Sequence, residues 1–272
     1  MAATTPIFLN HFFLTLDKAT FQAVKAQDWL RSALAPFEER TTKRNDSTYT
    51  GIYFYGRNTY FEFFEAGSEP GKVKGASGIA FGVEAAGGAK LLAGVLADQT
   101  LITRMVDGVD APWFHSAELA GAKRTDFFRA WAMEYHADFL KQWHAKLPPE
   151  NPNPLRRRAV LDRYVAKIGE WHHRNDFLLK DVVAIDLSLP AADAARFLKL
   201  MEALDYQFTG ETATGPEIRI TVGSKSKPYG IQAVTFSLQR SVPSDFELVI
   251  GGSRLELSAR GQAVWTFGGS PV

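Results

Sequence analysis

The sequence contains no cysteine. This absence excludes disulfide bonds, catalysis by a thiolate and zinc sites built on sulfur. No apolar run approaches the roughly 20 residues that a membrane-spanning helix needs. The formal net charge is only +1, so no strong field would draw the whole chain to nucleic acid or to an anionic membrane.

Signatures of nucleotide binding and of common hydrolases are also absent. The sequence has no G-x-G-x-x-G, G-x-x-x-x-G-K-[ST], G-x-S-x-G or H-E-x-x-H motif. The N-terminal stretch "MAATTPIFLNHFF" lacks the basic region that opens a secretory signal. We therefore expect a soluble, cytoplasmic protein that binds neither nucleic acid nor membranes.

What is present is enough apolar material for a large core. Hydrophobic residues make up 46% of the 272 residues, and charged residues make up 22%. This length corresponds to one large domain or two ordinary ones. The chain can therefore bury a sizeable core, within either one domain or two.

A short apolar strand followed by a helical pattern and further strands occurs three times. The three strands are "IFLNHFFLTL", "ASGIAFGVE" and "DVVAIDLSLP". The helical patterns that follow them are "DKATFQAVKAQDWLRSALAPF", "AAGGAKLLAGVLADQ" and "AADAARFLKLMEALDY". The pattern predicts an α+β fold of repeated βαβββ modules, in which cupped mixed sheets carry their helices on the outside.

These units suggest a division of the chain. Residues 8–67 and 76–140 form two units that pair within residues 1–147. Residues 148–180 form a proline-rich linker and a connecting helix, and residues 181–272 form a third, degenerate unit. An odd number of units leaves one without an internal partner. A homodimer would supply that partner, and so would the final strands near "AVWTF".

One histidine and one glutamate stand out in the first unit. His11 is a single imidazole inside an apolar strand, and taken alone it is more often a core residue than a ligand. In "YFEFFE", alternation places Tyr60, Glu62 and Phe64 on one face of a strand. A carboxyl among aromatic rings is costly to bury, so Glu62 needs a metal, an arginine or a hydrogen-bond donor. The alternative is an edge strand on which Glu62 faces water.

The stretches "FLNHFFLTLDKATF" and "STYTGIYFYGRNTYFEFF" resemble the vicinal oxygen chelate superfamily, which includes glyoxalase-like and extradiol dioxygenase-like proteins. They resemble still more closely uncharacterised bacterial proteins of that type. In that family a histidine in the first strand and a glutamate in the fourth strand of a module commonly hold a divalent metal. The resemblance implies these roles for His11 and Glu62. The second and third units depart from the pattern, because "GIAFGVE" and "VVAIDLSL" contain no histidine.

The family pattern also favours a strand in "AWAMEYH", which makes Glu134 the second unit's equivalent of Glu62. In a strand, Glu134 and His136 point the same way, whereas in a helix they lie about 200° apart. The resemblance thus implies a metal site of His11, Glu62, Glu134 and His136, suited to Fe²⁺, Mn²⁺, Zn²⁺ or Ni²⁺. The alternative is that Glu134 pairs with an arginine and His136 lies on the surface.

Several aromatic residues are candidates for contact with a substrate. Tyr53 and Tyr55 share one face of a strand and, with Tyr60, could line a pocket; core packing is the competing interpretation. His115 lies beside Trp113 on an expected strand, and both are further candidates. Histidine among aromatic residues is, however, more often packed and hydrogen-bonded than a ligand.

Two functions follow from these residues. The first is a metalloenzyme of glyoxalase-like type, acting on a small oxygen-chelating substrate with the metal as Lewis acid and Glu62 or Glu134 as general base. A lyase, an isomerase and a dioxygenase all stay open. The alternative is a metal-free protein that binds a small molecule or sequesters an antibiotic, which the missing histidine in "GIAFGVE" favours.

Overall fold

A computed structural model describes the chain over residues 7–69, 71–122, 127–142, 155–169, 176–223 and 228–268. In these ranges the protein is a mixed α+β structure built mostly of strands, with few helices. Its strands form two eight-stranded mixed sheets. No helix in the described ranges is long and apolar enough to cross a membrane.

The first sheet has the strand order β2-β3-β4-β1-β5-β8-β7-β6. Its strands are β1 (Ile7–Leu16), β2 (Phe37–Lys43), β3 (Thr48–Tyr55), β4 (Tyr60–Glu65), β5 (Ser77–Val83), β6 (Thr100–Val106), β7 (Val109–Glu118) and β8 (Phe128–Tyr135). β1 runs parallel to β4 and antiparallel to β5, and β5 runs parallel to β8. The centre of the sheet therefore brings together strands from both halves of the first 135 residues.

The second sheet has the order β10-β11-β12-β9-β13-β16-β15-β14, which is the order of the first sheet with eight added to every number. Its strands are β9 (Leu179–Ser188), β10 (Gln207–Thr209), β11 (Thr212–Thr214), β12 (Arg219–Gly223), β13 (Gly230–Leu238), β14 (Phe246–Ile250), β15 (Ser253–Ser258) and β16 (Gln262–Phe267). Residues 181–272, expected to form one unit, thus supply nearly all of an eight-stranded sheet.

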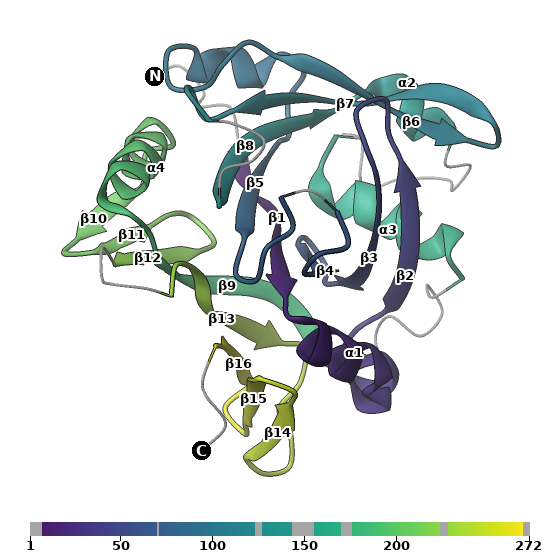
Figure 1. Ribbon diagram of the computed structural model, residues 1–272, viewed down its shortest axis with the longest axis vertical. Coiled ribbons are helices and arrows are strands. Elements are labelled where there is room, and N and C mark those ends of the chain that lie inside the picture. The colour runs from purple at the N-terminus through teal and green to yellow at the C-terminus, as the bar shows by residue number, and fades with distance from the viewer. Residues whose placement is uncertain are drawn as a thin grey trace.

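The first sheet curls into a barrel-like cup (Figure 1). Its two ends approach each other after β2 and within β6. There, the Asn45 backbone N–H donates to the Thr103 carbonyl at 3.3 Å, and Arg44 and Arg104 form an isolated β-bridge. This contact between the outer strands turns an open sheet into a nearly closed wall around an interior.

The helical segments are α1 (Lys18–Ala26), α2 (Ala137–Gln142), α3 (Arg157–Lys167), α4 (Ala191–Ala203), a π-helical turn η1 (Leu30–Leu34) and a 3-10 turn η2 (Gly88–Leu92). The expected start of the first helix is confirmed, since Asp17 caps α1 by accepting from the Thr20 backbone N–H. The helix expected after "ASGIAFGVE" is wrong. Only η2 forms there, because Gly87 and Gly94 adopt positive φ angles of 75° and 91° that interrupt an α-helix.

Helix α3 lies within the curve of the first sheet rather than outside it (Figure 1). Its residues Val160, Leu161 and Tyr164 belong to the same buried cluster as Tyr55 and other side chains of the cup. The helix has an apolar side to bury, and the aromatic interior of the cup is the surface that receives it. The proline-rich residues 148–154 of the expected linker, which precede α3, lie outside the described residues, as do residues 170–175.

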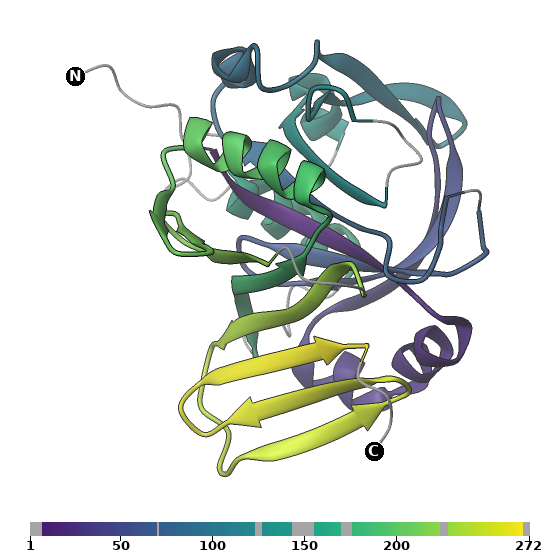
Figure 2. The same ribbon diagram turned by 60° about the vertical axis from the view of Figure 1, so that its left-hand side comes forward.

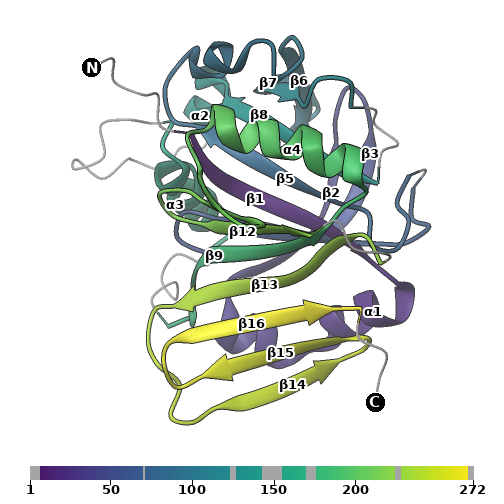
Figure 3. The same cartoon turned by 90° about the vertical axis from the view of Figure 1, so that its left-hand side faces the viewer.

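The second sheet packs against the back of the first (Figures 2 and 3). Phe61 and Phe63 of β4 face away from the cup, and their ring centroids lie 6.1 Å and 5.2 Å from Trp265 of β16. Phe61 also lies 5.2 Å from Phe236 of β13. One buried cluster thus spans both sheets, which confirms the predicted alternation along "YFEFFE".

Candidate active site

The central strands β1 and β4 place His11 and Glu62 together inside the cup. The two strands are parallel neighbours in which His11 pairs with Tyr60 and Phe13 pairs with Glu62. His11 Nε2 lies 3.8 Å from Glu62 Oε1, and both side chains are buried. The sequence predicted this pair from the two ends of one unit, and the register explains why they meet.

A single hydrogen bond orients the imidazole of His11. Its Nδ1 lies 2.8 Å from Asn10 Oδ1. An amide oxygen can only accept, so Nδ1 carries the proton and Nε2 presents a lone pair toward Glu62. The ring stacks on Tyr60 at 4.4 Å and meets Trp131 edge-on at 5.3 Å. Burial lowers the pKa of His11 to about 3, so the ring is neutral at physiological pH.

Glu62 is the unusual titratable group of the cup. Burial raises the pKa of its carboxyl to about 7, because loss of water outweighs the attraction of Arg40, Lys72 and Arg44. Near neutral pH the carboxyl therefore exists in both protonation states. A group of this kind can give or take a proton without a large free-energy cost.

A cavity of about 550 Å³ opens beside this pair. Aromatic side chains make up much of its wall: Phe13, Tyr49, Tyr60, Phe64, Trp113, Phe114 and Trp131. Within the described part of the chain, the buried Trp113 Nε1 has no hydrogen-bond partner. Polar and charged side chains form most of the remaining wall, and a cavity of this size is usual for a small-molecule site.

A polar cluster around Arg40 lies next to this cavity. Its guanidinium lies 4.1 Å from the centre of the Tyr53 ring and donates to the hydroxyls of Tyr55 and Tyr164. The Tyr55 hydroxyl donates to Glu38 at 2.7 Å. Tyr53 and Tyr55, predicted to contact substrate, belong to this cluster and not to the cavity wall.

Tyr60 and Trp113, also predicted to contact substrate, do line the cavity. Tyr60 precedes Glu62 by two residues on β4, so strand alternation turns both side chains to the inside of the cup. Trp113 reaches the same space from β7. The sequence therefore identified two aromatic residues of the cavity wall, Tyr60 on β4 and Trp113 on β7.

Glu134 points out of the cup. On β8 the cavity is lined by Trp131 and Met133, and Glu134 lies on the opposite face, where one carboxylate oxygen accepts from the Gly87 backbone N–H at 2.8 Å. The odd-even alternation of a strand separates it from Glu62. Glu134 therefore does not join His11 and Glu62.

His115 and His136 also lie away from the His11–Glu62 pair. His115 is the cross-strand partner of Glu134, so it shares the outer face. His136 follows β8, and its Nδ1 accepts from the Asp138 backbone N–H at 3.3 Å. The rings of His115 and His136 lie 5.8 Å apart.

The predicted four-residue metal set is therefore not assembled. Of its members only His11 and Glu62 face the cavity. Across the described ranges no three histidine, aspartate or glutamate side chains are grouped so that they could hold a metal ion. The residues present do not fit the complete ligand set that the resemblance implied.

Several residues of the site were missed by reasoning from sequence. Arg44 and Lys72 come from the loop regions beside β2 and β5, where no periodicity marks them. Trp131 could have been found, since alternation along "FRAWAMEY" places it on one face with Met133. Arg40 could not, because its role depends on Glu38 and on Tyr164, 124 residues later.

The fold and the site together define an α+β protein with a cupped sheet around a cavity lined by aromatic and charged side chains. The model of a family of unknown function, DUF5829, matches residues 9–267, and the chain belongs to that family. A search of curated proteins found no match.

A solved structure, described as the crystal structure of a hypothetical protein from Staphylococcus aureus, is similar in fold. It has a TM-score of 0.52 and 9% sequence identity, and the match covers 92% of this chain and 98% of that one. At this identity the likeness concerns the fold alone. The resemblance to the vicinal oxygen chelate superfamily stays a prediction, since none of these comparisons names that superfamily.

Proposed function

We propose that the cup binds a small organic molecule and that Glu62 is its proton-transfer group. The observation that carries this proposal is the buried Glu62 carboxyl, which faces a cavity of about 550 Å³ and has a pKa raised to about 7. The neutral His11 would position the carboxyl and accept a hydrogen bond through Nε2. This proposal agrees with the metal-free alternative and keeps a glutamate as general base.

A metalloenzyme is the second candidate. The favourable observation is the position of His11 Nε2, which lies 3.8 Å from a Glu62 carboxylate oxygen while Nδ1 is hydrogen-bonded to Asn10. A divalent ion such as Fe²⁺, Mn²⁺, Zn²⁺ or Ni²⁺ would find two protein ligands there, and a chelating substrate would have to supply others. The glyoxalase-like reaction predicted from sequence depends on this candidate.

We also infer that repeated βαβββ modules underlie both sheets. The identical order of strands in the two sheets supports this inference. The helix of the unit is present as α1 after β1 and as α4 after β9. Within the described residues, only the short turn η2 forms after β5, and no helix lies between β13 and β14. A cytoplasmic location and a homodimer stay predictions.

Binding in the cup can be tested through the tryptophan indoles. Trp113 and Trp131 line the cavity, whereas Trp265 is fully buried in the other cluster. With ¹⁵N-labelled tryptophan, we expect benzyl alcohol, benzoate or benzylammonium to shift the first two indole signals and leave the third in place. Glu62→Gln should change the affinity several-fold, and Glu65→Gln, on the outer face of β4, is the matched control.

The same spectra separate the two candidates. If no probe moves Trp113 or Trp131, the binding proposal is wrong. Mn²⁺ added at equimolar concentration should broaden these indole signals only if the cup holds a metal. Broadening in the native protein that disappears in His11→Ala would favour the metalloenzyme.

A further inference from the structure

Three rings at the mouth of the cup surround the ammonium group of Lys72. Lys72 Nζ lies 3.5 Å from the centre of the Phe64 ring, 4.8 Å from that of Phe13 and 5.9 Å from that of Tyr49. Phe64 meets Phe13 and Tyr49 edge-on, with centroid separations of 5.8 Å and 5.6 Å. Phe13, Tyr49 and Phe64 thus form an aromatic cage around a cation.

The backbone makes room for the cage at two glycines. A Cβ on Gly51 of β3 would lie 2.7 Å from the Phe64 ring, and a Cβ on Gly78 of β5 would lie 2.5 Å from the Phe13 ring. Any other residue at these positions would push the rings out of place. The sheet therefore provides the space in which the Phe64 and Phe13 rings pack directly against its backbone.

The charges of the cavity favour a cation beside the cage. Two of the basic groups are neutralised locally, since Arg44 pairs with Asp46 and Arg129 pairs with Glu118. The other charged groups that line the cavity are Glu62, Glu69 and Lys72. The charge of Lys72 lowers the pKa of Glu62, so a ligand cation that takes its place would favour the ionised Glu62 carboxyl in the same way. The faces of the rings carry negative potential, so they attract a cation and repel an anion.

We propose that the cage is the subsite for the cationic head of a small organic ligand, such as a quaternary ammonium, and that Lys72 occupies it when the ligand is absent. The proposal rests on the function proposed above, because it names the class of molecule that the cup binds. Lys72 stands on the segment between β4 and β5, and it would swing toward solvent when a ligand enters. The Lys72 ammonium group thus competes with the ligand for the aromatic cage.

The competing role of Lys72 gives an unusual expectation. A lysine that contributed to the site would weaken binding when removed. A lysine that fills the cage lowers the fraction of protein ready to bind, so its removal should strengthen binding. Lys74→Ala is the matched control: it removes the same charge two residues away, where Lys74 is exposed and pairs with Asp17.

The test compares choline with 3,3-dimethyl-1-butanol, which has the same shape without the charge. Affinities come from the shift of the Trp131 indole signal or from calorimetry on the full chain. We expect choline to bind the native protein about tenfold more tightly than its neutral isostere. Lys72→Ala should tighten choline binding about fivefold, Phe64→Leu should weaken it about fivefold, and Lys74→Ala should leave it unchanged.

Equal affinities for choline and its isostere would overturn the proposal, and so would weaker choline binding in Lys72→Ala. Lys72 lies on a loop, so this variant still gives an answer if Phe64→Leu fails to fold. Either outcome leaves the proposed function intact as long as benzyl alcohol or benzoate shifts Trp113. If no probe of any charge shifts that indole, the proposed function fails as well.

Discussion

At the scale of single residues, the cup contains a buried carboxyl, Glu62, whose charged form is disfavoured by the loss of water. Glu62 is 8% exposed and faces a cavity lined by aromatic and charged side chains. The positive charges of Arg40, Lys72 and Arg44 lower the pKa of this carboxyl, but burial raises it by a larger amount. His11 is neutral and offers only a hydrogen-bond acceptor. Proteins retain such groups mainly where they carry out chemistry.

The raised pKa of Glu62 predicts a pH-dependent cost in stability. The folded pKa of about 7 lies above the ordinary value of 4.5, so the folded state binds the proton more tightly than the unfolded chain. The free energy of unfolding therefore falls as the pH rises from about 4.5 to about 7, by roughly 3 kcal/mol at most. Glu62→Gln should remove this fall.

Urea unfolding of both proteins between pH 4 and pH 8 measures the effect. The gain of Glu62→Gln over the native protein should grow across this range and level off above about pH 7. Glu65→Gln is the control, because it removes a carboxyl from the same strand outside the cavity. It should not show the pH-dependent gain in stability that is expected for Glu62→Gln. A gain that is constant with pH would show that Glu62 is not perturbed.

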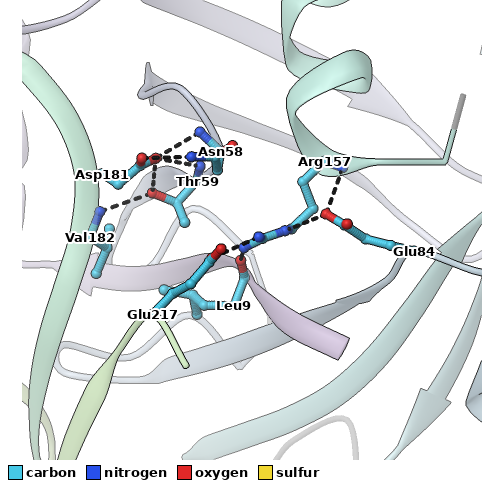
Figure 4. Close-up of polar contacts among 8 residues, drawn as sticks. All are labelled: Leu9, Asn58, Thr59, Glu84, Arg157, Asp181, Val182 and Glu217. Carbon is cyan, nitrogen blue, oxygen red and sulfur yellow. Dashed lines mark hydrogen bonds and ion pairs between the residues drawn. The ribbon is translucent and has the colours of Figure 1, made fainter. Parts of the chain in front are cut away.

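At the scale of secondary-structure elements, helix α3 joins the two sheets through Arg157 (Figure 4). This guanidinium is 4% exposed. It donates to the Leu9 carbonyl of β1, to Glu84 at 2.9 Å and to Glu217 at 2.7 Å. Arg157 is the middle one of three consecutive arginines, and it is buried because acceptors from three separate segments meet there.

Arg157→Met should therefore destabilise the protein strongly. The change removes the guanidinium that donates to the Leu9 carbonyl, Glu84 and Glu217, and loss of one partner of a buried ion pair costs about 3 to 5 kcal/mol. Arg158→Met is the control. Arg158 is 55% exposed and lies 3.8 Å from Asp162, so its loss should cost less than about 1 kcal/mol. Equal unfolding free energies for the two variants would contradict this account.

At the scale of the whole molecule, the two sheets share one core and a polar joint (Figure 4). The Asp181 carboxylate of β9 accepts from the backbone N–H groups of Asn58 and Thr59, at 2.6 Å and 3.1 Å, in the turn before β4. The Thr59 hydroxyl in turn accepts from the Val182 backbone N–H. Because β4 carries Glu62, the second sheet helps to position the site without lining its cavity.

A shared core predicts a single unfolding transition. Leu255 of β15 is fully buried, and Leu255→Ala should cost about 2 to 5 kcal/mol. We expect the Trp131 signal of the first sheet and the Trp265 signal of the second to shift to the same lower urea midpoint. Phe208→Ala, at a residue 40% exposed on β10, is the control. An unchanged midpoint for Trp131 would mean that the sheets unfold independently.

Local patterns in the sequence determined much of this protein. Alternation separated Glu62 from Phe61 and Phe63, the Asp17 cap placed α1, and the strand–helix pattern indicated an α+β fold with a cupped sheet. These features depend on residues a few positions apart, where propensity and periodicity act.

Only the tertiary structure decided which carboxyls share a site and what fills the cup. Glu134 has the same local pattern as Glu62, yet its strand turns it outward against Gly87. Helix α3 packs inside the cup, and the back of the first sheet packs against the second sheet. Such outcomes depend on register, on curvature and on contacts between residues far apart along the chain, which no local pattern encodes.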